Sequence, residues 1–210
     1  MSQGTYSREE VFFLPYEYNG NFHEKKIVIS GETMNRNTNT PDRVIDIGGL
    51  LKCSLSQYSD HNRLLYLEYG ISCDVNPDVT NPLQPAGSVK LANIILVIPR
   101  DSAIPTLVQY MRKKVPIDKI SIKDIGWSGG DQTEIRSEHV FGKNYIIDWR
   151  PGFFCDLFVI RAEEWLLKVS DYNQSDATPM GSNEDKFNVR TGDDSVTISA
   201  SAGGGGGGGI

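Results

Sequence analysis

Residues 145–160, with the sequence YIIDWRPGFFCDLFVI, decide the fold more clearly than any other stretch of the chain. Two apolar segments, 145–149 and 157–160, flank the pair Pro151 and Gly152, which favours a turn between two strands. Short alternating or apolar segments bounded by turn residues recur along the sequence, at 26–31, 43–47, 64–69, 92–98, 119–123, 165–169 and 195–199. The pattern predicts an all-β fold, an antiparallel β-sandwich of two sheets packed face to face.

One segment departs from this pattern. Leu107, Val108 and Met111 lie at helical spacing within 104–114, and Pro105 suits the first turn of a helix. Two polar or proline-containing stretches, 74–88 and 174–185, are predicted to be loops. We therefore divide the chain into three parts: a flexible N-terminus (1–10), one sandwich domain (11–200) with insertions around 48–118, and a tail (201–210) whose glycine run predicts disorder.

The composition excludes several classes of function. The 21 basic residues are outnumbered by 27 acidic ones, which argues against nucleic-acid binding because that needs clustered positive charge. Three cysteines without a CxxC pair and three scattered histidines argue against a disulfide framework and a metal site, and no cofactor is expected. No apolar run has the length of a membrane span or of a secretory signal. We expect a protein of the reducing cytoplasm without membrane insertion, for which an extracellular location would require a non-classical route.

From Trp127 onward the sequence resembles a galectin carbohydrate-recognition domain. The stretch WSGGDQTEIR at 127–136 is similar to the family's W-G-x-E-x-R motif with four extra residues in its turn. Further segments follow in the family's order at 141–143, 145–160, 165–167 and 192–198, and its opening strands are matched at 14–16, 26–31 and 43–47. The resemblance covers 11–47 and 119–200. It implies a galectin-like jelly roll of the concanavalin A-like class, with the N- and C-terminal strands adjacent.

The resemblance also implies a carbohydrate-binding site. Trp127 would stack on a sugar ring, although a buried core tryptophan is the alternative. Glu134 and Arg136 are two residues apart, so they share one face of a strand and could orient sugar hydroxyls, or form only a surface ion pair. The family's H-x-N-x-R motif is absent. If 94–100 takes the place of that strand, Arg100 joins the site; if 64–70 does, no arginine follows.

The function implied is that of a lectin rather than an enzyme. Its partners would be glycans or glycoproteins of the β-galactoside type, bound weakly or with altered specificity because the histidine and asparagine of the family motif are missing. The alternative is a structural or attachment protein that keeps the sandwich without sugar binding. A hydrolase using Asp148 or Asp156 is a third interpretation. A homodimer formed through the terminal strands stays open.

Overall fold

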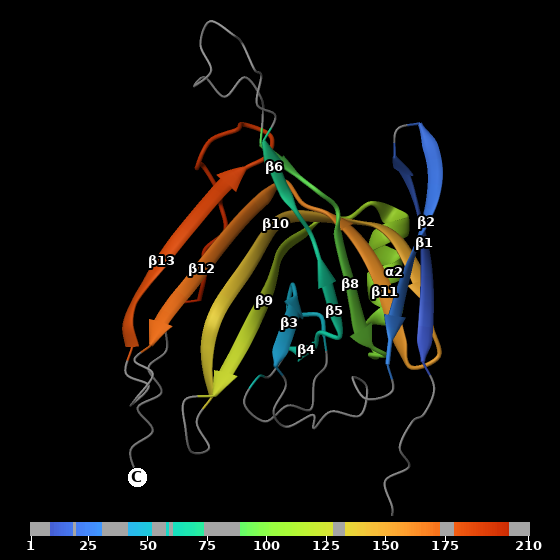
Figure 1. Cartoon of the computed structure of the whole chain (residues 1–210), viewed down its shortest axis with the longest axis horizontal. Coiled ribbons are helices and arrows are strands. Elements are labelled where there is room, and N and C mark those ends of the chain that lie inside the picture. Colours follow the sequence, from blue (N-terminus) through green and yellow to red (C-terminus); the bar gives the residue numbers. More distant parts are fainter. Residues whose placement is uncertain are drawn as a thin grey trace, which may run out of the picture.

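The computed structural model describes residues 9–18, 20–30, 42–51, 58, 61–73, 89–127, 133–172 and 179–201. Within them the chain forms thirteen strands and one helix (Figure 1). The predicted flexible N-terminus, the tail beyond Ser201 and the predicted loop at 74–88 lie outside the described residues, apart from Glu9 and Glu10. The elements are β1 (Glu10–Tyr18), β2 (Asn21–Ile29), β3 (Arg43–Ile47), β4 (Asn62–Arg63), β5 (Tyr66–Glu68), β6 (Ile71–Cys73), β7 (Val89–Leu91), β8 (Ile94–Pro99), α2 (Ile104–Lys113), β9 (Ile117–Trp127), β10 (Thr133–Pro151), β11 (Cys155–Arg161), β12 (Glu164–Tyr172) and β13 (Pro179–Asn188).

One long strand, β10, belongs to two sheets. Its first part pairs with β9 and β12, and its second part pairs with β11. The first sheet therefore has the order β4-β3-β9-β10-β12-β13, and the second has the order β10-β11-β8-β5. Every pair of strands is antiparallel, which confirms the predicted all-β antiparallel fold.

A local change of backbone conformation lets β10 pass from one sheet to the other. Lys143 has a φ of 52°, in the left-handed region that few residues other than glycine adopt. The next residue, Asn144, is fully buried, and its side-chain amide donates to the carbonyls of Ile117 at 3.0 Å and Phe141 at 2.8 Å. These bonds hold the bend in place, because breaking them would leave buried polar groups without partners.

The main core lies between the two sheets, which also meet on the side away from β10. There the chain crosses from one sheet to the other, since Leu64 N donates to Arg43 O and Leu65 N donates to Val97 O. Helix α2 adds Ile104 and Leu107 to the same core, which confirms the predicted helix. Fully buried side chains from the two sheets fill the space: Ile45, Ile47, Ile120, Ile122 and Phe141 from the first sheet, and Ile94, Leu96, Ile98, Phe158 and Ile160 from the second.

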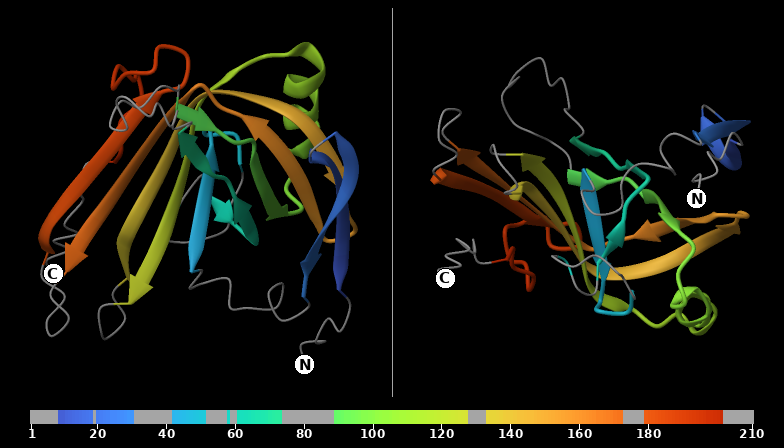
Figure 2. Two further views of the ribbon diagram at one scale, coloured as in Figure 1. Left: turned by 45° about the horizontal axis from the view of Figure 1, so that its top comes forward. Right: turned by 90° about the horizontal axis from the view of Figure 1, so that it is seen from below.

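The hairpin β1–β2 packs on the outer face of the second sheet, beside β11 (Figure 2). Its buried side chains are Phe12, Leu14, Ile27 and Ile29, which contact Val97, Leu157 and Val159. The Glu10 carboxylate anchors the start of the hairpin, since it accepts the backbone N–H groups of Phe153, Phe154 and Cys155.

Three expectations about the chain are wrong. The N- and C-terminal strands are not adjacent, because β1 pairs with β2 and β13 pairs with β12. The polar stretch predicted as a loop at 174–185 contributes to β13, an edge strand whose residues 180–185 are all exposed. Residues 195–199 do not form a strand, although Val196 and Ile198 are less exposed than their neighbours.

Candidate functional site

The residues predicted to bind a sugar fall into two separate places. Arg136 lies with its guanidinium 5.3 Å from the centre of the Tyr172 ring, and Glu134, which is half-buried, lies two residues earlier on β10. Arg100 instead bonds to the turn at the far end of β10, where it donates to Gly152 O at 2.6 Å. The side chain of Trp127 lies outside what the structure describes. The structure therefore does not bring Arg100 to Glu134 and Arg136.

The aspartates of the hydrolase interpretation are bonded to neighbouring side chains. Asp156 is fully buried, and its carboxylate accepts the Trp149 indole N–H at 3.0 Å and faces Arg100 at 3.3 Å. Asp148 accepts Trp149 N at 2.9 Å and pairs with Arg150 at 2.9 Å. The bonds of each carboxylate therefore go to neighbouring residues: Asp156 bonds to Trp149 and Arg100, and Asp148 bonds to Trp149 and Arg150.

A first polar cluster borders the main core on the inner face of the first sheet. Tyr69 Oη lies 2.6 Å from His139 Nδ1, and His139 Nε2 lies 3.2 Å from Asp124 Oδ2. Ser137 Oγ donates to the same carboxylate at 2.5 Å, and Arg43 pairs with it from β3. If Tyr69 donates to Nδ1, the proton on Nε2 faces Asp124, so the contacts fix the orientation of the imidazole ring.

The charge state of Asp124 follows from these contacts. Burial would raise the pKa of this carboxyl, but the hydrogen bonds from His139, Arg43 and Ser137 outweigh it and hold the pKa well below its usual range. The sequence shows these residues only as separate polar positions, and Arg43 and Tyr69 lie far along the chain from Asp124, Ser137 and His139. Their convergence depends on the pairing of β3, β9 and β10.

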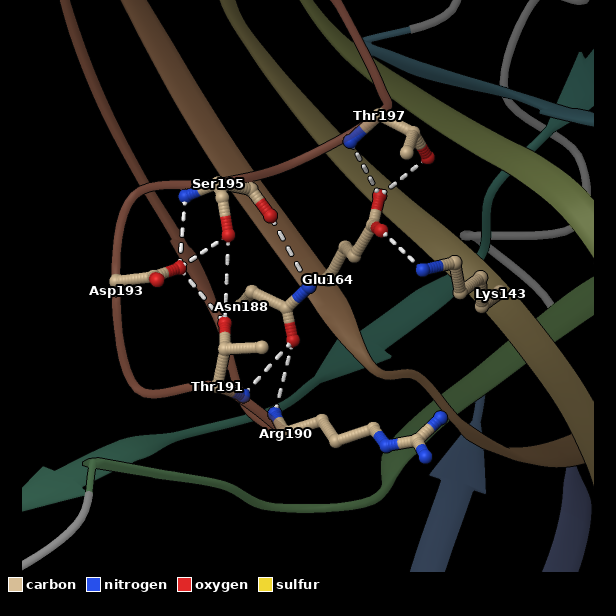
Figure 3. A network of polar contacts seen from close by, with 8 residues as sticks. All are labelled: Lys143, Glu164, Asn188, Arg190, Thr191, Asp193, Ser195 and Thr197. Atoms are coloured by element: carbon tan, nitrogen blue, oxygen red, sulfur yellow. Dashed lines mark hydrogen bonds and ion pairs between the residues drawn. The ribbon is translucent and has the colours of Figure 1, made fainter.

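A second cluster fixes the turn that follows β13 (Figure 3). The Asn188 side-chain oxygen accepts Arg190 N at 2.9 Å and Thr191 N at 3.3 Å, while its amide donates to Ser195 O at 3.0 Å. Across the turn, Asp193 accepts Thr191 Oγ1 at 2.7 Å and Ser195 N at 3.0 Å. Short side chains of this type commonly bond to nearby backbone groups in turns. The turn leads the chain back over the first sheet.

Residues 195–201, which we call the strap, run over the outer face of β9, β10 and β12. Side chains alternate across a strand, so Glu138, Val140 and Gly142 face away from the core that holds Phe141. Val140 is fully buried on that outer face. At Gly142 the strap comes so close that an added Cβ would lie 2.7 Å from Ile198 Cγ2.

Two buried carboxylates bind the strap. Glu164, at the start of β12, accepts Thr197 N at 2.9 Å and Thr197 Oγ1 at 2.8 Å, and its other oxygen pairs with Lys143 at 2.8 Å (Figure 3). Glu138, on β10, accepts Ser201 N at 2.7 Å and Ser201 Oγ at 3.0 Å. Such charge-assisted bonds are stronger than those between neutral groups.

The ionised form of both carboxylates is favoured. Burial would raise the pKa of each, but the bonds from Lys143 and Thr197 lower the pKa of Glu164. Bonds from Ser121 and Ser201 lower the pKa of Glu138 in the same way. Two lysines complete the attachment from the sides, since Lys119 Nζ donates to Ser199 O at 2.8 Å and Lys168 Nζ donates to Ser201 O at 3.2 Å.

Comparisons with known proteins found similar folds among solved structures but no matching sequence among family models or curated proteins. Among solved structures, a type six secretion system protein is similar with a TM-score of 0.61 and 9% identity, over 73% of this chain and 98% of that one. Hcp1 from Salmonella typhimurium is similar with a TM-score of 0.54 and 11% identity, over 72% and 97%. Hcp1 from the E. coli EAEC 042 pathovar gives 0.52 and 11%, over 70% and 98%.

These similarities overturn the galectin interpretation. The resemblance rested on short segments in a common order, and short β-segments separated by turns are shared by many all-β folds. The predicted lectin function and the predicted glycan partners are therefore wrong as well. No helix in the described part of the chain is long and apolar enough to cross a membrane. At identities of 9 to 11%, only the fold is shared: the chain has the fold of these three solved structures.

Proposed function

We propose that this chain is a non-enzymatic structural subunit that assembles with further copies of itself in a secretion apparatus of the type VI kind. The observation that carries the proposal is the similarity in fold to a type six secretion system protein over 98% of that protein's length. It agrees in part with the alternative drawn from the sequence, a structural or attachment protein that keeps a galectin-like sandwich without sugar binding.

The first sheet has two unlike edges that support assembly. At one edge β13 pairs only with β12 among the described strands. At the other edge β3 is covered over two residues by the short strand β4. Open strand edges pair readily with other strands. A contact between two different edges is head-to-tail, and such contacts close into rings when the rotation between subunits allows it.

The outer face of the β1–β2 hairpin provides apolar surface for contacts between copies. Val11 lies directly opposite Val28, and both are exposed, at 37% and 42%. Phe13, on the same face, is 48% exposed. Grouped exposed apolar side chains commonly mark an interaction surface. The hairpin already buries its other face, so a partner would cover the second one.

Export through the same apparatus would give the chain its route out of the cell. The sequence analysis expects a protein of the reducing cytoplasm, for which an extracellular location would require a non-classical route. Passage through a secretion apparatus of the type VI kind is the non-classical route that fits this expectation.

The mass of the purified full chain in solution tests the proposal. We expect static light scattering to give a mass several times that of one chain, and electron microscopy to show closed particles of uniform size. Val11→Asp should reduce this assembly, whereas Val115→Asp, at a position equally exposed at 37%, should not. A monomer at every concentration up to the solubility limit would refute the proposal.

A further inference from the structure

The strap and the face beneath it are built as a peptide and its binding site. The strap forms no backbone ladder with the sheet in the described part of the chain. Its attachment consists of side chains of the body that bond to its backbone and hydroxyl groups. Every group that binds the strap is therefore present whether or not this particular strap occupies the face.

The two carboxylates are held in position by the body itself. Ser121 Oγ donates to Glu138 Oε1 at 2.7 Å, and Lys143 pairs with Glu164 Oε1 at 2.8 Å. The second oxygen of each carboxylate, Oε2, bonds to the strap. Without a strap, Oε2 of each carboxylate would lose the donors that Thr197 and Ser201 supply and would be left with water alone. An empty face therefore favours a replacement peptide.

The spacing of the contacts defines the peptide that fits. It needs an N–H and a hydroxyl at two positions four apart, as Thr197 and Ser201 provide. It also needs an apolar side chain directly after the first of them, where Ile198 meets Gly142. Gly142 has no side chain, which allows this close approach. The matching sequence in this protein is its own TISAS at 197–201.

We propose that the strap of a second copy can occupy this face in place of the chain's own strap, so that assembled copies exchange straps. Exchange of an identical element between copies preserves every contact and requires only that a hinge opens. The turn between β13 and the strap is that hinge. Its bonds around Asn188 and Asp193 are local, and Gly192 has a φ of +73°.

The inference rests on the proposed self-assembly, because the chain's own strap is tethered. A short tether gives its ligand an effective concentration in the millimolar range, about 1 mM. A strap from a free copy in dilute solution competes poorly with that. Copies held side by side in an assembly present their straps at a comparable local concentration, and exchange then becomes measurable.

Disulfide trapping between two differently tagged chains tests the inference. Ser121 Oγ and Ser201 Oγ both bond to Glu138 Oε1, at 2.7 Å and 3.0 Å, so the two residues are close when a strap is docked. One chain carries Ser121→Cys and the other Ser201→Cys, both with Cys53→Ser and Cys73→Ser. After co-assembly and mild oxidation, we expect a linked heterodimer that mass spectrometry assigns to positions 121 and 201.

Three controls separate the outcomes. A chain with both new cysteines should form the 121–201 disulfide, either within itself or between copies, and failure to form it at all would contradict the docked geometry. Thr197→Pro in the Ser201→Cys chain should reduce the heterodimer, because it removes the N–H that Glu164 accepts, whereas Ser199→Ala should leave it unchanged. Light scattering on the same samples measures assembly. If assembled chains form the 121–201 disulfide only within one chain, strap exchange is overturned and the proposed function stands. If the chain is a monomer, the proposed function itself is refuted.

Discussion

A methyl group added at Gly142 tests how closely the strap lies against β10. The Cβ of an alanine would lie 2.7 Å from Ile198 Cγ2, 2.7 Å from Glu164 Oε2 and 3.0 Å from Glu164 Cβ. The two separations of 2.7 Å are too short for carbon in a folded protein, so the strap or the carboxylate must move. Overpacking of this kind destabilises a protein by about 1–3 kcal/mol. At 2–4 °C per kcal/mol for a chain of this size, we expect Gly142→Ala to lower the Tm by about 2–12 °C.

Gly70→Ala is the matched control. No atom lies within 4 Å of a Cβ at Gly70, and its backbone is outside the left-handed region, so its effect should stay within about 0.5 kcal/mol. Thermal unfolding followed by circular dichroism measures both variants. Hydrogen exchange should also show faster exchange at Thr197 and Ser201 in Gly142→Ala. Equal Tm and equal exchange in the two variants would refute the close docking of the strap.

Three further predictions concern pH, thiol chemistry and truncation. The pKa of Asp124 and of the two strap-binding carboxylates is lower in the folded chain than in the unfolded chain. Their contribution to stability is therefore complete above about pH 4.5, and it is lost as the pH falls through the pKa values of the folded chain. Urea unfolding should give a lower free energy of unfolding at pH 3 than at pH 7, with a smaller difference in Asp124→Asn; equal values at both pH values would contradict this. Burial and the neighbouring Glu10 raise the pKa of the Cys155 thiol, so an alkylating reagent at pH 8 should label the exposed Cys73 and leave Cys155 unmodified in the folded protein, as peptide mass spectrometry can show. Deletion of 203–210 should leave the Tm unchanged, because the last described contacts are at the end of the strap. Deletion of 195–210 removes the strap and should lower the Tm. Equal Tm values for the two truncations would count against strap docking.

Local patterns in the sequence correctly predicted secondary structure where the apolar side chains of a segment contact a core. The hairpin around Pro151 and Gly152 forms with the predicted strands, in the register Tyr145 to Arg161, and helix α2 begins at Ile104 with Pro105 in its first turn. In these segments the hydrophobic period follows directly from the contact with the core.

The same hydrophobic patterns gave wrong predictions of secondary structure for residues 195–199 and for β13. The alternation at 195–199 predicted a strand, but no backbone ladder joins the strap to the sheet in the described residues. Ile198 lies against Gly142, and Val196 is less exposed than its neighbours. Strand β13 was missed for the opposite reason. Its residues 180–185 are exposed on both faces, so backbone hydrogen bonds to β12 hold it without any hydrophobic period.

The sequence by itself determined that this protein is an antiparallel β-fold with one short helix, because most of its strands contact a core and carry apolar side chains there, in alternating or continuous runs. Only the tertiary structure decided which strands are neighbours and which polar residues meet. Asp124, Ser137 and His139 come together through the pairing of β9 with β10, and Glu138 and Glu164 meet the strap because β10 pairs with β12. Strand order depends on contacts between residues far apart in the chain, and a pattern of period two is the same whichever neighbour a strand takes.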